Sequence, residues 1–252
     1  MAELFNLIER GNHWLKLDEI PDYPQALNGL QLENSGEIHQ IFASVDACLP
    51  VIRQAAEKKG SLLVVHHGLF WQGAQRIEGA VYEKLRIAME NDLAIYSAHI
   101  PLDVHSSLGN NARLLAALEL KGEFESFFPW KGIQLGMRAL VNVEREDLVQ
   151  RVERATGSSA HLCPGGPETI RNLGIITGGA GSEVAAIAEC GVDTLITGEG
   201  PHWSYTAAEE LGVNVIYGGH YATETFGVKA LAERWSQKFN VPWEFIDHPT
   251  GL

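Results

Sequence analysis

The sequence predicts an α/β protein built from two similar lobes, and three observations lead to this prediction. Short aliphatic runs alternate with amphipathic segments of helical length, which is the pattern of parallel strands joined by helices. Polar residues follow the predicted strands, at the edge where open α/β sheets bind ligands. The same order of elements and motifs occurs twice in the 252 residues, which indicates an internal duplication.

The first lobe is expected in residues 1–125. Apolar spacing predicts a helix at residues 2–10, and a loop with the Asn28-Gly29 turn pair follows it. Strands and helices then alternate, starting with a strand, at residues 38–45, 49–59, 62–65, 81–91, 93–96 and 111–120. Gly60 stands where it would close the first of these helices, so residues 38–65 form a βαβ unit.

The second lobe is expected in residues 126–252, with a C-terminal helix that can pack back on the first lobe. It opens with a strand at 137–143 and a helix at 146–155, and the Pro- and Gly-rich break from Cys163 to Pro167 is interpreted as a connection. The pattern of the first lobe then returns, as strand, helix and strand at residues 173–177, 182–189 and 194–197.

Two alignments describe the duplication. Residues 41–71 match residues 172–202 without a gap and place Gly60 on Gly191. Further along, residues 95–103 parallel residues 216–224, so that His99 aligns with His220 and Asp103 with Glu224. Each half therefore carries a strand, a histidine and, four positions later, a carboxylate.

Composition excludes several classes of protein. Hydrophobic content of 45% and charged content of 20% are those of a globular protein. A net charge of -13, with no basic segment, argues against a nucleic-acid partner. The apolar runs are too short for a membrane span and the N-terminus lacks signal-peptide features, so we expect no membrane partner and a cytoplasmic location.

The histidines suggest a metal site. His66 and His67 follow the strand at 62–65, and a pseudo-twofold arrangement of the lobes would bring them into one cleft with His99, Asp103, His220 and Glu224. Four imidazoles and two carboxylates suit two ions that share a bridging carboxylate. Nitrogen and oxygen donors without sulfur suit Zn, Fe, Mn, Co or Ni. The alternative is that these histidines satisfy hydrogen bonds in a core.

Six stretches together resemble a known family over nearly the whole chain. They are Asn28-Gly29-Leu30-Gln31, Val65-His66-His67-Gly68, His99-Ile100-Pro101-Leu102-Asp103, Gly109-Asn110-Asn111, Ile196-Thr197-Gly198-Glu199 and Gly219-His220-Tyr221-Ala222-Thr223-Glu224. With these stretches taken together, the chain is similar to the bacterial dinuclear metal-centre proteins of the Nif-three-like family, known as GTP cyclohydrolase 1 type 2 homologues.

The resemblance implies a fold, a site and an assembly. It implies two intertwined α/β lobes, a ring-shaped homohexamer, and two divalent ions per chain held by His66, His67, Asp103, His220 and Glu224. Glu224 would bridge both ions, and His99 would lie beside them.

The leading functional hypothesis is a metal-dependent hydrolase acting on a small nucleotide or a heterocyclic amide or amidine, with His99 or Glu199 as catalytic proton carriers. The alternative is a metal-handling or adaptor protein that uses the same ligands without catalysis. A hydrolase must keep a coordination position open to water, whereas a storage site can be closed.

Further residues near these strand ends are weaker candidates. His105 and His202 lie close to the same loops. Trp71 and Trp203 follow two strand ends and could either line the cleft or pack in the core. The glycine-rich loop at residues 177–182 could cradle a phosphate on its N–H groups or could be a plain tight turn.

Overall fold

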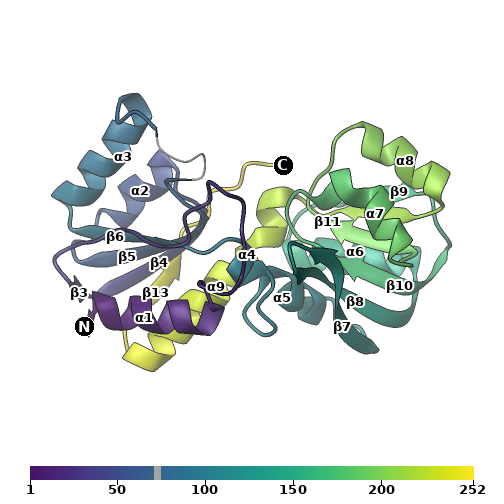
Figure 1. Cartoon of the computed structure of the whole chain (residues 1–252), viewed down its shortest axis with the longest axis horizontal. Helices are drawn as coiled ribbons and strands as arrows, with labels where there is room; N and C mark the ends of the chain where they lie inside the picture. Colours follow the sequence, from purple (N-terminus) through teal and green to yellow (C-terminus); the bar gives the residue numbers. More distant parts are fainter. Residues whose placement is uncertain (71–74) are drawn as a thin grey trace. The chain divides into compact units, whose positions relative to one another are not determined.

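The computed structural model describes residues 1–70 and 75–252, and Trp71 lies outside them (Figure 1). The chain forms two compact units. The first contains Met1–Leu102 and Gly227–His248, and the second contains Asp103–Phe226 and Pro249–Leu252. Among the described residues, no helix combines the length and apolar character needed to cross a bilayer.

The main sheet of the first unit has the strand order β13-β4-β5-β6-β2. Its first four strands are parallel, and β2 runs antiparallel to β6 at one edge. The strands are β2 (Gly29–Leu32), β4 (Gln40–Asp46), β5 (Ser61–His67), β6 (Leu93–Ser97) and β13 (Trp243–Phe245). A separate antiparallel pair consists of β1 (Ala2–Glu3) and β3 (Glu37–Ile38).

Helices cover both faces of this sheet (Figure 1). On one face, α2 (Leu49–Ala55) and α3 (Gly79–Glu90) share an apolar core with β4, β5 and β6. On the other, α1 (Leu4–Leu15) meets α9 (His220–Phe239), whose buried Trp235 donates a 2.9 Å hydrogen bond to the Leu7 carbonyl and packs edge-on against Tyr96 of β6. Gly11 permits this contact, since a Cβ there would lie 2.4 Å from the Trp235 ring.

The sheet of the second unit has the order β7-β8-β10-β11-β12-β9. The central strands β10, β11 and β12 are parallel, and β8 and β9 flank them antiparallel. The strands are β7 (Glu123–Trp130), β8 (Ile133–Glu144), β9 (His161–Pro164), β10 (Thr169–Ile175), β11 (Thr194–Thr197) and β12 (Asn214–Tyr217).

Two apolar cores, one on each face, hold this second sheet. One core includes Leu114 of α5 (Asn110–Ala117) and Leu148 of α6 (Arg145–Thr156). The other includes Ile187 of α7 (Val184–Glu189), which follows the 3-10 helix η1 (Ala180–Glu183), and Ala208 of α8 (Trp203–Leu211). Each unit is therefore an α/β layer structure, as the alternating sequence pattern predicts.

The strand orders support the internal duplication. β4-β5-β6-β2 and β10-β11-β12-β9 share the same sequence of parallel, parallel and antiparallel pairings. Phe42 pairs with Leu63 and Leu173 pairs with Thr194, so both first pairings join positions 21 residues apart.

The third strands do not keep the alignment expected from sequence. Ser97 pairs with Val65, whereas Ile216 pairs with Ile196, the residue that aligns with Val65. Ser97 therefore corresponds to Ile216 and not to Gly218, which is a shift of two residues. His99 consequently precedes its helix, α4 (Ile100–Asp103), whereas His220 is the first residue of α9. The sheet register does not make these two histidines counterparts.

The structure divides the chain between Leu102 and Asp103 rather than at the expected 125/126 boundary. The reason is that α5 packs its buried leucines into the core of the second unit. Asp103 thus belongs to the second unit, and the larger part of α9 belongs to the first. Of the expected connection from Cys163 to Pro167, the first two residues belong to strand β9 and residues 165–167 do link β9 to β10. The expected loop with the Asn28-Gly29 pair runs into β2, which begins at Gly29.

Candidate metal centre

His66 and His67 are the last two residues of β5, and both ring Nδ1 atoms are held by acceptors. His66 is fully buried, and its Nδ1 lies 2.8 Å from the Ala98 carbonyl oxygen. Because a carbonyl oxygen only accepts, His66 Nδ1 carries the proton and Nε2 is the basic nitrogen. His67 Nδ1 lies 2.9 Å from Oδ1 of Asp46, at the end of the neighbouring strand β4.

His99 is held by a buried aspartate from a distant loop. Its Nδ1 lies 2.9 Å from Asp22 Oδ1, and its backbone N–H donates to Asn28 Oδ1 at 2.7 Å. Asp22 Oδ2 accepts from Asn28 Nδ2 at 2.7 Å and from the Ile100 N–H at 3.1 Å. Burial raises the pKa of Asp22, but the hydrogen bonds and charge of His99 and the Asn28 and Tyr23 donors outweigh it and leave this pKa below its usual value.

The three imidazoles of the first unit form a cluster. The ring centroid of His66 lies 4.9 Å from that of His67 and 4.7 Å from that of His99. Each histidine offers a nitrogen within 4.8 Å of the other two, so the group could hold a metal ion. Because Nδ1 contacts an oxygen in each of the three, an ion held by this group would be bound through Nε2.

In the second unit, His220 lies between two carboxylates. Its Nδ1 is 3.0 Å from Glu199 Oε1 and its Nε2 is 3.2 Å from Glu224 Oε2. His220 and Glu224 are one helical turn apart at the start of α9, so their side chains share a face. Burial lowers the pKa of His220, but hydrogen bonds and charges from Glu224 and Glu199 outweigh it and raise the pKa to about 9.

Two glycines leave space for the side chain of Glu224 and the backbone of His220. A Cβ at Gly178 would lie 2.2 Å from Glu224 Oε1, and a Cβ at Gly198 would lie 2.6 Å from the His220 Cα. Gly178 has a φ of +71°, which a glycine adopts without strain. The strand ends of β10 and β11 therefore approach the start of α9 closely because they carry no side chains there.

Asp103 is held by the two asparagines that open α5. Asn110 Nδ2 donates to Asp103 Oδ1 at 2.7 Å, and Asn111 Nδ2 donates to the Asp103 carbonyl at 3.2 Å. Asn111 Oδ1 in turn accepts from the Thr177 N–H at 2.9 Å. These asparagines fix the buried carboxylate relative to the end of β10.

The remaining sequence candidates have other roles. In the glycine-rich loop, the N–H groups of Gly178, Ala180 and Gly181 donate to Thr223 Oγ1, Thr197 Oγ1 and the Glu199 carbonyl, respectively, so they do not point at a phosphate. The loop is a turn that leads into η1. His105 Nδ1 accepts from two backbone N–H groups of its own loop. Trp203 starts α8 and is half exposed, and His202 lines a pocket described below.

Sequence reasoning missed the residues that hold the imidazoles. Asp22 and Asp46 were not candidates, although Asp22 is almost fully buried with its carboxylate against His99. Asn28, Asn110 and Asn111 stood within the motifs of the resemblance, but without a role.

The geometry defines a class of protein: two α/β units with histidines at or shortly after strand ends, in which the Nδ1 atoms of His66, His67, His99 and His220 contact oxygen acceptors. Comparison with known proteins gives the family. The sequence model described as Duf34/NIF3 (NGG1p interacting factor 3) matches residues 4–250, and the chain belongs to this family.

Relatives and solved structures agree with this assignment. A "GTP cyclohydrolase 1 type 2 homolog" of Deinococcus radiodurans is 42% identical over 95% of this chain and 90% of the relative. One of the same name from Pyrococcus abyssi is 37% identical over 96% of both. A solved structure described as "protein ybgI, unknown function" has a TM-score of 0.90 at 31% identity, and one from Thermus thermophilus has 0.88 at 34%, each covering 100% of both chains.

Proposed function

We propose that the protein binds two divalent metal ions and uses them to hydrolyse a small nucleotide or a heterocyclic amide or amidine. The observation that carries the proposal is a contact that four imidazoles have in common. In His66, His67, His99 and His220, Nδ1 contacts a carbonyl or carboxylate oxygen. Histidines that bind metals through Nε2 nearly always have Nδ1 held in this way, because the contact fixes the tautomer and the orientation of the ring.

The donor set fits such ions. It offers imidazole nitrogens and carboxylate oxygens without sulfur, which suits Zn, Fe, Mn, Co or Ni. We assign His66, His67, Asp103, His220 and Glu224 as ligands, and we propose that the half-sites of the two units form one dinuclear centre with Glu224 bridging. Two such ions would supply the Lewis acidity that activates water at neutral pH.

The other residues of the site have supporting tasks in this proposal. Asp22 holds the Nδ1 proton of His99, so His99 Nε2 is the nitrogen that accepts a proton from an attacking water and returns it to a leaving group. Glu199 accepts from His220 Nδ1 and so acts as an orienting partner for a ligand rather than as the main proton carrier. Asn110 orients Asp103 in the same manner.

The names of relatives support a hydrolytic role, since several are called GTP cyclohydrolase 1 type 2 homologues. The second candidate is a metal-handling or adaptor protein that uses the same ligands. The clustering of three imidazoles favours neither role, because the cluster could hold an ion in both.

We further propose that the protein is a homohexamer and is located in the cytoplasm. Light scattering should then give a mass near six times that of the 27.6 kDa chain.

Metal analysis combined with a substrate screen tests the proposal. Protein purified without chelator or affinity tag and loaded with Zn or Mn should contain about two ions per chain. Glu224→Gln keeps the size of the side chain but removes the bridging charge, so we expect it to lose both ions, whereas His66→Ala should mainly weaken one. A saturating content of one ion in the wild type would refute the dinuclear centre. Two ions without hydrolysis of any nucleotide or cyclic amide in the screen would favour the metal-handling role.

A further inference from the structure

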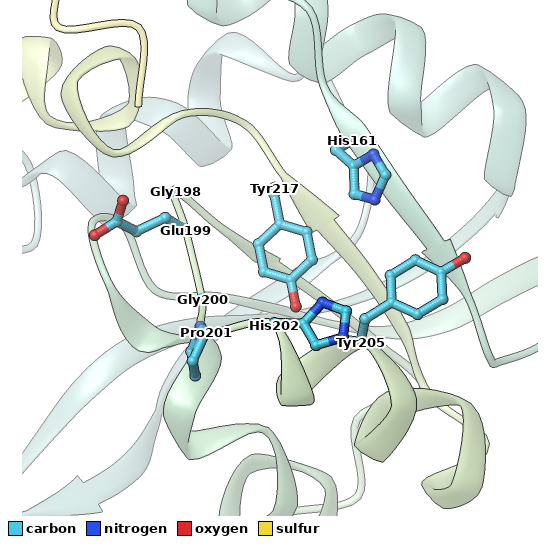
Figure 2. Close-up of a pocket in the computed structure, with 8 residues that line it drawn as sticks. All are labelled: His161, Gly198, Glu199, Gly200, Pro201, His202, Tyr205 and Tyr217. Carbon is cyan, nitrogen blue, oxygen red and sulfur yellow. The ribbon is translucent and has the colours of Figure 1, made fainter.

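A pocket of about 500 Å³ lies in the second unit, and the proposed metal ligands do not line it (Figure 2). It is formed by the segment after β11 together with residues of β9, α8 and β12. Its lining consists of His161, Gly198, Glu199, Gly200, Pro201, His202, Tyr205 and Tyr217. A volume of this size suits a small molecule, because ligand pockets typically measure about 300–1,000 Å³.

Aromatic rings dominate the walls of this pocket. The His161 ring centroid lies 5.8 Å from that of Tyr205 and 6.2 Å from that of Tyr217, and the planes of His161 and Tyr217 are only 28° apart. Figure 2 shows these rings and His202 grouped around one space. Apolar ring faces of this kind recognise another flat ring by stacking.

Tyr217 is fixed in place by a short chain of hydrogen bonds. Ser204 Oγ donates to the Pro201 carbonyl at 2.6 Å, so the Tyr217 hydroxyl must donate to Ser204 Oγ, 2.7 Å away. The phenol oxygen keeps its lone pairs for a ligand. Gly200 also matters here, because a Cβ at that position would lie 3.0 Å from the Tyr217 ring and 2.7 Å from Ser204 Oγ.

The polar atoms of the pocket narrow the choice of ligand. Imidazole nitrogens and the phenol oxygen lie at the edges of the ring faces, so a ring that carries its own nitrogen or carbonyl groups satisfies them better than a hydrocarbon. None of the described residues that line the pocket is a lysine or an arginine. With a net charge of -13 for the chain, a polyanionic group has no attraction to this surface.

We infer that this pocket binds a planar, uncharged heteroaromatic ring. Glu199 connects the pocket with the proposed centre, since it lines the pocket while its carboxylate points away from the aromatic side chains (Figure 2) and contacts His220. A ring seated here therefore lies beside the segment that orients a proposed ligand. That the ring is part of the substrate rests on the proposed function, whereas binding of the ring itself requires no metal.

Saturation-transfer NMR on the full chain tests the inference with two probes. Nicotinamide and cyclohexanecarboxamide have the same carboxamide and similar size, but only nicotinamide has a flat heteroaromatic ring. We expect nicotinamide to receive saturation from chelator-treated protein and cyclohexanecarboxamide to receive little. Equal signals from both probes, or none from nicotinamide, would overturn the inference.

Variants locate the binding. His161→Ala, at an exposed position, should weaken nicotinamide binding at least about fivefold, since loss of an aromatic stacking partner has an effect of this order. Tyr217→Phe should weaken it less than Tyr217→Leu because the phenyl ring remains. His39→Ala, an exposed histidine of the first unit, serves as the control. Unchanged affinity in both His161→Ala and Tyr217→Leu would refute this location.

The experiments distinguish failure of the ring-binding site from failure of the proposed hydrolase function. If nicotinamide binding depends on His161 and Tyr217 but the metal-loaded protein hydrolyses nothing, the ring site stands and the hydrolase assignment falls. If hydrolysis is found and these variants leave both nicotinamide binding and KM unchanged, the pocket is not the ring site.

Discussion

Asp22 Oδ1 lies 2.9 Å from His99 Nδ1, although 77 positions separate the two residues in the chain. Both oxygens of Asp22 accept hydrogen bonds, Oδ1 from His99 and the Tyr23 N–H, and Oδ2 from Asn28 and Ile100. The carboxylate therefore determines which nitrogen of His99 carries the proton. That choice decides whether His99 Nε2 can accept a proton or bind an ion.

Asp22→Asn should change the tautomer of His99. At the Oδ1 position the new NH2 group would face one donor, the Tyr23 N–H, together with His99 Nδ1; at the Oδ2 position it would face two donors, from Asn28 and Ile100. The first arrangement is less costly if the His99 proton moves to Nε2. Nitrogen-15 NMR of the histidine side chains should show a proton on Nδ1 in the wild type and on Nε2 in Asp22→Asn. An unchanged pattern would mean that Asp22 does not control the tautomer. We also expect a stability loss of about 1–3 kcal/mol.

Asp22 should contribute to the pH dependence of folding. Its folded-state pKa is lowered, so its contribution to stability is present above the unfolded pKa and is lost as pH falls through the folded value. Below about pH 4, the free energy of unfolding of chelator-treated wild type should fall more steeply than that of Asp22→Asn. Urea denaturation at several pH values measures the difference. Parallel curves for the two proteins would contradict the assignment.

Gly178→Ala should release metal without removing any ligand. A Cβ at Gly178 meets Glu224 Oε1 at 2.2 Å, so the carboxylate must move. Gly157→Ala is a matched control, because Gly157 has a similar φ of +69° and no atom within 4 Å of the added Cβ. Both substitutions should cost about 1–2 kcal/mol of stability through the left-handed backbone. Only Gly178→Ala should lower the metal content measured by elemental analysis, and equal metal contents would show that the close approach is unimportant.

His99→Ala separates two roles for this histidine. As a proton carrier, His99 can be removed with metal content near two ions per chain, while turnover falls by about 10² to 10⁴. Loss of one ion would identify His99 as a further ligand, in keeping with its place among the three clustered imidazoles. Retention of both metal and turnover would exclude a catalytic role and direct attention to Glu199 or His202.

Sequence was a good guide to the elements that repeat and a poor one to the edges of the sheets. The buried strands β5 and β11 were predictable because continuous aliphatic runs have few other uses. β2 and β9 are four-residue strands at sheet edges, and their Gly and Pro residues are those of loops. Antiparallel pairing with β6 and β12, which sequence does not reveal, makes them strands.

The residues of the candidate site also fall into two groups, those that sequence could identify and those that it could not. His66, His67, His99, His220 and Glu224 could be selected from sequence because each follows a predicted strand. The oxygens that hold their Nδ1 atoms could not, since Asp22 lies 77 positions from His99 and Asp46 lies 21 positions from His67. Whether an aspartate contacts a histidine over such distances depends on the folded backbone. The two-residue shift of β12 was hidden for the same reason, because a shift by two keeps every side chain on its own face of the sheet.

Helix α9 determines when the first unit can complete its fold during synthesis on the ribosome. The first unit comprises Met1–Leu102 and Gly227–His248, and its core is incomplete without the indole of Trp235 against Tyr96 and Leu7. A ribosome making about 5–20 residues per second needs on the order of ten seconds to travel from the end of the first segment to this tryptophan. Most of the second unit, Asp103–Phe226, is synthesised in that interval. The first unit, although begun first, is therefore completed only after most of the second has been made, and until then one face of its sheet is covered by α1 without α9.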